Sequence, residues 1–352
     1  MRRTLLVSGL AFLSTIGAHA SSHTPSYPAK VCGLERVRVF ESSGEGTSAI
    51  YASPPGTPSD QIAIFFAANM DVNTDGNLRS YHPDDPKGGT LALNTVLNAI
   101  GDAWDENGRL LDCDVGASGK RDIGLRSGSC KKEYYAAFTG ARENGFDKNR
   151  FPKVDMSAVI ATRDGVPCYS DGYFVSVTRL PFDTRKAECD PGHWFDSLAF
   201  NLTVYPPRQL YAILEDGSRL ITDKGDLAIT LYRSEDSGEE RLAFAINGDS
   251  GPKGKLGEGS VALLAALQGI SIPEEPTKEW VRDLPLEKVY YLIFPAPEND
   301  LSKNGQGGTQ GQITQAKIDN FGRTVFDAWA AAAGFATGED RLKRCVSDLT
   351  PG

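Results

Sequence analysis

The chain has 352 residues, of which 37 are Lys or Arg and 46 are Asp or Glu, so its formal net charge is −9. With 40% hydrophobic and 24% charged residues, its composition is that of a globular protein, which excludes a wholly disordered chain, a collagen-like repeat and a bundle of membrane spans. The acidic excess argues against nucleic acid and anionic membranes as partners, because both are polyanions. We therefore expect a soluble monomer.

The first 20 residues have the pattern of a secretory signal peptide. Arg2 and Arg3 precede an apolar run over residues 5–16, and Ala18-His19-Ala20 supplies small residues at the cleavage positions. Cleavage after Ala20 removes two positive charges and no acidic ones, which changes the net charge from −9 to −11. We expect a secreted or periplasmic protein.

Residues 21–31 are rich in Ser and Pro and predict a flexible lead-in. Short apolar runs that carry β-branched or aromatic residues then predict strands at 62–66, 159–161, 173–178, 210–214, 227–232, 242–246 and 289–294. Helical spacing predicts helices over 93–104, after a Thr90 cap, and over 318–329, and Ser260 caps a short helix over 261–267. Residues 105–153 and 297–311 lack such patterns and predict loops.

These elements indicate a mainly β fold with packed helices, of the α+β class. We expect one catalytic domain over residues 32–350, with an insert at about 105–165 and a C-terminal helical extension.

The cysteines number six, which is an even count, and all follow the predicted cleavage site. In an exported chain this predicts three disulfides, for which 15 connectivities exist. The alternative is buried free thiols. Our sequence-local prediction pairs Cys113 with Cys130, Cys168 with Cys189, and Cys32 with Cys345.

Several kinds of catalytic site lack support in the sequence. The histidines after residue 20 are His23, His82 and His193, and none has the spacing of zinc ligands. Neither a Gly-x-Ser-x-Gly elbow nor a phosphate-binding glycine loop occurs. We therefore expect neither a metal nor a cofactor.

The densest candidate site is the glycine-rich segment 247–260, Asn-Gly-Asp-Ser-Gly-Pro-Lys-Gly-Lys-Leu-Gly-Glu-Gly-Ser. It carries Asp249 near one end and Glu258 near the other, and two carboxyl groups are the minimum equipment of a glycoside hydrolase. The loop must fold back to bring them together, and glycine permits sharp bends. The alternative is that Asp249 makes an Asx turn and Glu258 favours the helix start that follows.

Other candidate residues lie outside this segment. Asp71 and Asp75 fall in Asp-Val-Asn-Thr-Asp-Gly, which begins like a calcium loop but has His82 where a bidentate Glu is expected, so a tight turn is the default. Tyr81 and His82 follow it, and these side chains either line a sugar site or pack. Asp226 precedes a predicted strand and is either a further site carboxylate or a turn residue.

The segment from Gly248 to Leu267, with Gly-Asp-Ser-Gly-Pro, Leu-Gly-Glu-Gly-Ser and an Ala/Leu-rich helix, resembles the signature of glycoside hydrolase family 75 chitosanases. Further motifs follow the order of that family: residues 70–76, 80–83, 172–178 and 225–228. The resemblance spans about residues 60–270. The insert around 105–165 and the C-terminal extension depart from the family pattern.

The resemblance implies a secreted endo-chitosanase in which Asp249 and Glu258 are the essential acidic pair and the anomeric configuration is inverted. It also implies a polycationic substrate, chitosan, which a chain of charge −11 would attract. On helix-dipole grounds Glu258 is the base and Asp249 the acid, although burial could reverse these roles. Asp71, Asp75, Tyr81, His82 and Asp226 are then candidates for binding the substrate.

The Asp-x-Gly-Pro turn is also similar to that of double-psi β-barrels of the expansin and lytic transglycosylase type, which implies a six-stranded barrel core. Two other functions stay open. One is cleavage of another amino-sugar polymer such as peptidoglycan, and the other is a non-catalytic carbohydrate-binding protein of the cell wall.

Overall fold

A closed six-stranded β-barrel forms the centre of the computed structural model, which describes residues 27–42, 46–111, 128–301 and 311–349. The strand order is β4-β16-β11-β15-β14-β17, and β17 pairs back onto β4. The β4–β16 and β11–β15 pairs are parallel and the other four are antiparallel. The barrel strands are β4 (Ile64–Asn73), β11 (Leu202–Tyr205), β14 (Leu227–Arg233), β15 (Glu240–Ser250), β16 (Glu258–Ser260) and β17 (Leu286–Phe294).

Stretches of β4, β14, β15 and β17 are buried on both faces, which explains the apolar runs in their sequences. In β4, Phe65 belongs to one core cluster and Phe66 to the other. Phe66 stacks on Tyr291 with ring centroids 4.7 Å apart, and Tyr205 meets Phe66 edge-on at 6.4 Å. Aromatic contacts from three strands thus tie the barrel wall together.

Three strands extend the sheet beyond β4: β3 (Gly46–Ala52), β2 (Leu34–Ser42) and β1 (Lys30–Val31). Part of the predicted lead-in therefore lies in the sheet, where Val31 pairs with Leu34. The Cys32–Cys345 disulfide joins this edge to the C-terminal helix.

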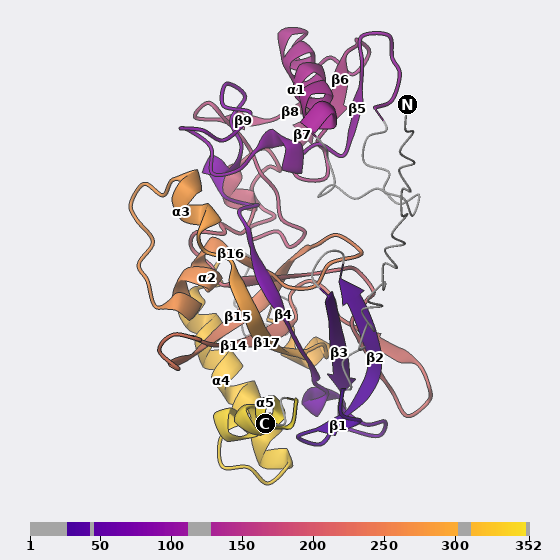
Figure 1. Ribbon diagram of the computed structural model, residues 1–352, viewed down its shortest axis with the longest axis vertical. Coiled ribbons are helices and arrows are strands. Elements are labelled where there is room, and N and C mark those ends of the chain that lie inside the picture. The colour runs from indigo at the N-terminus through magenta and orange to yellow at the C-terminus, as the bar shows by residue number, and fades with distance from the viewer. Residues whose placement is uncertain (1–26, 43–45, 112–127, 302–310, 350–352) are drawn as a thin grey trace, which may run out of the picture.

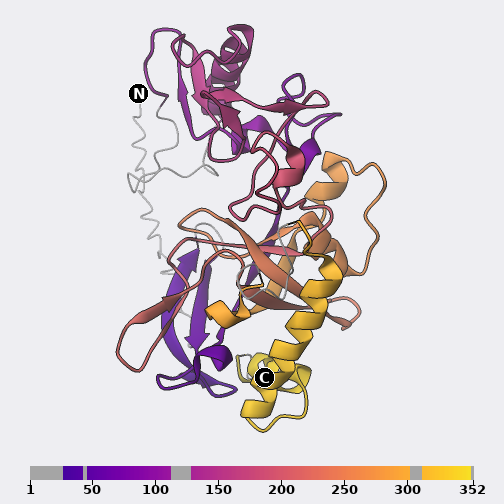
Figure 2. The same cartoon turned by 180° about the vertical axis from the view of Figure 1, so that it is seen from behind.

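Helices cover the barrel on two sides (Figure 1). They are α2 (Val261–Gln268), α3 (Lys278–Arg282), α4 (Gln315–Ala332) and α5 (Gly338–Leu349). The Ser260 hydroxyl accepts from the Leu263 N–H at 3.1 Å, and Gly269 ends α2 in the left-handed conformation. Figure 2 shows α4 running along the barrel, where its Phe326 meets Phe244 of β15 edge-on.

A second lobe lies above the barrel in Figure 1 and has its own core. It contains α1 (Gly128–Glu143), and β5 (Asp102–Trp104) pairs there with β6 (Lys153–Asp155). The small hairpins of the chain pair β7 (Thr162–Arg163) with β8 (Val166–Pro167), β9 (Tyr169–Ser170) with β10 (Tyr173–Phe174), and β12 (Tyr211–Ile213) with β13 (Arg219–Ile221).

The predicted fold class is confirmed, because the chain is mixed α+β around a closed six-stranded barrel. Strands were predicted at six places where β4, β10, β12, β14, β15 and β17 lie, although β10 covers only the first two residues of the predicted 173–178. The helices predicted at 261–267 and 318–329 are α2 and α4.

Three predictions of local structure are wrong. Residues 93–104 form only a 3₁₀ turn at 96–98 followed by β5, because the Thr95 hydroxyl caps the turn by accepting from the Leu97 N–H at 3.3 Å. The predicted loop 105–153 contains α1. At 159–161 a single bridge from Ile160 to Ser176 replaces the predicted strand. The α1 signal is the buried spacing of Tyr134, Ala137, Phe138 and Ala141, which our reading of the segment overlooked.

Two of the predicted disulfides are present, Cys32–Cys345 and Cys168–Cys189. Such bonds are compatible with an oxidising compartment. Cys113 lies outside the described residues, so its pairing with Cys130 stays a prediction, as does the signal peptide at 1–20. Of the helices in the described ranges, none combines the length and apolarity that a membrane crossing requires.

Candidate active site

The barrel aligns Asp249 and Glu258 on either side of one residue, Val204 of β11. Val204 pairs with Asp249 in the parallel ladder to β15 and with Glu258 in the antiparallel ladder to β16. Glu258 in turn pairs with Asp71 of β4. Side chains of residues paired across neighbouring strands project from the same face of a sheet. The row Asp249–Val204–Glu258–Asp71 therefore presents three carboxyl groups on one face.

The spacing of this row follows from the geometry of a sheet. Neighbouring strands lie about 4.8 Å apart, so the Cα atoms of Asp249 and Glu258 are separated by about 10 Å. The loop between them folds back as the sequence requires, because a Cβ atom on Gly251 would lie 3.9 Å from Cδ of Glu258.

Gly257 brings the end of this loop into backbone contact with β4. Its carbonyl accepts from the Asp71 N–H at 2.9 Å, and its φ is +81°. A Cβ atom there would lie 1.7 Å from the carbonyl oxygen of Asn69. Only glycine allows this approach, which places Glu258 directly beside Asp71.

Polar and charged groups surround the Glu258 carboxylate, whose side chain is 16% exposed. Lys255 Nζ lies 3.6 Å from its Oε1 and also contacts Asp71 Oδ2. The Asn73 side chain forms a further hydrogen bond to it. Burial raises the pKa of Glu258, and Lys255 opposes that rise.

Asp75 lies in the turn that follows β4. Its N–H donates to Asn73 Oδ1 at 2.7 Å, so the predicted tight turn is present. Its Oδ1 accepts from the Tyr81 hydroxyl at 2.8 Å and from Ser176 Oγ at 3.4 Å. Burial raises the pKa of Asp75 to about 7, the Tyr81 hydrogen bond opposes that rise, and the negative charge of Glu258 adds to it.

Asp249 is held at the end of β15 by two backbone donors. Its Oδ1 accepts from the N–H groups of Ser250 at 2.7 Å and Arg179 at 3.2 Å. Burial raises the pKa of Asp249 well above its usual value, and the neighbouring Asp75 and then Glu258 raise it further. Because both donors use Oδ1, the other oxygen is the one available to carry a proton.

The second lobe completes the site from the opposite side. Tyr81 is 1% exposed and belongs to the lobe core, and Asn94 Nδ2 donates to its hydroxyl at 3.3 Å. Ser176 and Arg179 belong to the chain segment that returns from the lobe to the barrel. The carboxyl cluster therefore lies at the junction of barrel and lobe.

The other two predicted site residues lie apart from these contacts. The His82 ring packs edge-on against Tyr173, with centroids 4.8 Å apart, and its Nδ1 accepts from the Asp84 N–H at 3.0 Å. Asp226 is 2% exposed and its Oδ2 accepts from the Asp223 N–H at 2.6 Å. The structure thus brings Asp71, Asp75, Tyr81, Asp249 and Glu258 together.

The sequence analysis did not single out several residues of the site: Asn73, Ser176, Arg179 and Lys255. Asn73 and Lys255 stand inside the two acidic motifs, so their positions were a usable signal. Ser176 and Arg179 lie 101 and 70 residues from the carboxylates they contact. Ser176 falls within the motif at 172–178, whereas no local pattern marks Arg179.

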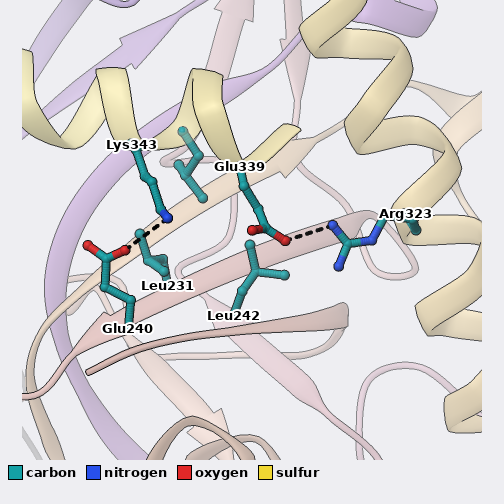
Figure 3. A pocket seen from close by; sticks show the side chains of 7 residues that line it. Leu231, Glu240, Leu242, Arg323, Glu339 and Lys343 are labelled. Atoms are coloured by element: carbon teal, nitrogen blue, oxygen red, sulfur yellow. Dashed lines mark hydrogen bonds and ion pairs between the residues drawn. The ribbon is translucent and has the colours of Figure 1, made fainter. Parts of the chain in front are cut away.

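In the described ranges, no three His, Cys, Asp or Glu side chains are arranged to hold one metal ion. A pocket of about 290 Å³ lies at the other end of β15 (Figure 3). It has an apolar floor and two ion pairs, Lys343–Glu240 at 3.3 Å and Arg323–Glu339 at 3.0 Å. The charged groups of this pocket pair with one another, and the pocket is separate from the carboxyl cluster.

The raised pKa of Asp75 predicts a pH dependence of stability. In the folded protein the Asp75 carboxyl group keeps its proton up to about pH 7, whereas in the unfolded chain it loses the proton at about pH 3.9. The resulting stability is complete below pH 4 and is lost as the pH rises through 7. We expect the melting temperature of the native protein to fall more between pH 4 and 8 than that of Asp75→Asn.

The exposed Asp236→Asn, on the β14–β15 turn, is the matched control and should follow the native curve. Thermal unfolding at five pH values measures the difference. Parallel curves for the native protein and Asp75→Asn would contradict the protonated state of Asp75.

No protein-family model matches the sequence, and no curated protein matches it either. The resemblance to family 75 chitosanases therefore rests on the motifs themselves and on the positions of their residues.

Proposed function

We propose that the protein is an exported endo-acting glycoside hydrolase that cleaves β-1,4 linkages of chitosan with inversion of configuration. Asp249 is the general acid and Glu258 the general base. The observation that carries this proposal is the pairing of both residues with Val204, which puts their side chains on one face of the sheet, two strands apart.

The separation favours inversion. In inverting glycosidases the two carboxyl groups lie about 6.5–9.5 Å apart to leave room for water, and in retaining enzymes about 5–5.5 Å apart. The backbones of Asp249 and Glu258 lie two strand spacings apart, about 10 Å, and a gap of that size can accommodate the larger carboxyl separation. The closer partner of Glu258 is Asp71, which is already engaged by Lys255.

The surroundings assign the two roles. Lys255 and the Asn73 amide favour the ionised form of Glu258, as a base requires, although burial raises its pKa. Asp249 has two acidic neighbours, and burial raises its pKa well above the usual value, which keeps it protonated in mild acid. Glu258 then removes a proton from water as the oxygen attacks C1, while Asp249 protonates the leaving O4 as the C1–O4 bond breaks.

The charge of the site supports a cationic sugar polymer as the substrate. Four carboxyl groups, those of Asp71, Asp75, Asp249 and Glu258, meet at the junction with Lys255. With Asp75 and Asp249 protonated in mild acid, Asp71 and Glu258 still outweigh Lys255 by one negative charge. Glucosamine units are protonated under these conditions, so the site attracts them.

The test is to incubate the secreted chain with soluble chitosan, with chitin and with cell-wall sacculi in parallel between pH 4 and 7. Release of reducing ends from chitosan, with shortening of the polymer, is the expected result. Release from sacculi alone would replace chitosan by peptidoglycan as the substrate. Binding to chitosan without any shortening would replace the hydrolase by a carbohydrate-binding protein.

A further inference from the structure

We infer that Lys255, anchored by Asp71, is a positioning residue that holds Glu258 as the ionised base of the reaction. This inference rests on the proposed function. Lys255 lies inside the glycine-rich segment 247–260, and the proton transfers assigned to Asp249 and Glu258 do not themselves involve it.

The contacts of Lys255 place its charge between two carboxylates from adjacent strands. Its Nζ lies 3.6 Å from Glu258 Oε1 and contacts Asp71 Oδ2. The exposed fractions of these side chains are 24% for Lys255, 16% for Glu258 and 41% for Asp71. Glu258 is the most enclosed of the three, so the cation acts on it where solvent screens least.

The backbone around Lys255 is fixed on both sides. Its own N–H donates to the Pro252 carbonyl at 3.2 Å, and the next residue, Leu256, is fully buried and donates its N–H to Ser42 Oγ at 3.1 Å. Gly257 then accepts from the Asp71 N–H. The backbone that carries the Lys255 side chain is thus already fixed, so less conformational entropy is lost when its ammonium group is held between the two carboxylates.

Acidic groups face Glu258 from three other elements. Asp71 belongs to β4, Asp75 to the turn after it, and Asp249 to β15, and the phenol of Tyr81 lies beyond Asp75. The charge of Asp71 disfavours a negative charge on Glu258, and Asp75 and Asp249 add to this effect when they ionise. Lys255 is the cation that opposes them, and Asp71 fixes its position while balancing its charge.

The experiment compares Lys255→Met with Lys255→Arg, using Lys253→Met as the matched control. Lys253 is exposed and lies in the same loop. We expect the acid limb of the kcat/KM profile on chitosan to move up by about one pH unit in Lys255→Met, the size of shift that loss of an adjacent opposite charge produces. Arginine should restore most of the native profile, and Lys253→Met should leave it unchanged.

A direct titration of Glu258 separates this inference from the choice of substrate. In protein labelled with ¹³C at glutamate side chains, and without any sugar, Glu258 should titrate at a higher pH in Lys255→Met than in the native protein. An unchanged titration in the folded variant overturns the inference even if the enzyme cleaves chitosan. A raised titration in a protein that leaves chitosan intact supports the Lys255–Glu258 coupling and overturns the proposed substrate.

Discussion

Replacing Glu258 by glutamine is expected to lower kcat on chitosan by about 10²–10⁴-fold, the usual contribution of a general base. Glutamine keeps the shape of the side chain and its capacity to bond with Asn73 but cannot accept a proton from water. The fold should be retained, because Glu258 is paired through its backbone in β16. Initial rates of reducing-end release give the measurement.

The same reasoning predicts a different response for Asp249→Asn. The acid is needed only when the leaving oxygen must be protonated, so the variant should lose activity on chitosan but keep much of it on an oligomer with an activated aryl leaving group. Glu258→Gln should be slow on both substrates. The reverse pattern would exchange the two roles.

Glu240→Gln is the matched control for both variants. Glu240 is the first residue of β15, and the strand ends at the Asp249–Ser250 pair, so the control removes a carboxylate at the far end of the same element. Its partner is Lys343, in the pocket of Figure 3. Full activity in this control, with loss in the other two variants, assigns the effect to the site rather than to net charge.

Gly257→Ala is expected to destabilise the fold by about 2–5 kcal/mol. Holding alanine at φ +81° costs about 1–2 kcal/mol, and relieving the overlap of its Cβ with the Asn69 carbonyl costs about 1–3 kcal/mol more. Since that relief moves β16 from β4, activity should also fall. Denaturant unfolding monitored by circular dichroism measures the loss.

Gly217→Ala isolates the conformational part of this effect. Gly217 has a φ of +79°, almost the same as Gly257, but nothing lies within 4 Å of a Cβ atom added there. The Gly217→Ala variant should therefore lose only the conformational part of the stability, about 1–2 kcal/mol, and keep its activity. Equal losses of stability in the two variants would show that the close approach of β16 to β4 does not constrain the site.

Local motifs could indicate part of the carboxyl cluster because the residues involved lie close in sequence. Asp249 and Glu258 stand in one glycine-rich segment, and Asp71 and Asp75 in one turn. At Asp75 the sequence predicted a tight turn by default, and the turn is present. Burial raises the pKa of Asp75 although the Tyr81 hydrogen bond opposes the rise, and only the folded chain supplies that burial.

Long-range pairing was out of reach of the sequence. β11 has four residues, all buried, and its apolar content did not distinguish it from its surroundings, yet its Val204 pairs with both Asp249 and Glu258. Residues 93–104 have the apolar spacing of a helix but do not form one. Thr95 and Gly101 favour turns, and the Thr95 hydroxyl caps a 3₁₀ turn instead. The barrel itself was predicted by resemblance of a motif, not by periodicity.

The most direct test of the central claim is the anomeric configuration of the first product that the native protein releases from a chitosan oligomer, followed by proton NMR before mutarotation. If Asp249 and Glu258, which lie two strands apart, act on the sugar through an intervening water, the β-linkage yields an α-anomeric end. A β-anomeric end would mean that a carboxylate attacks the sugar directly, and would contradict the arrangement of Asp249 and Glu258 described above.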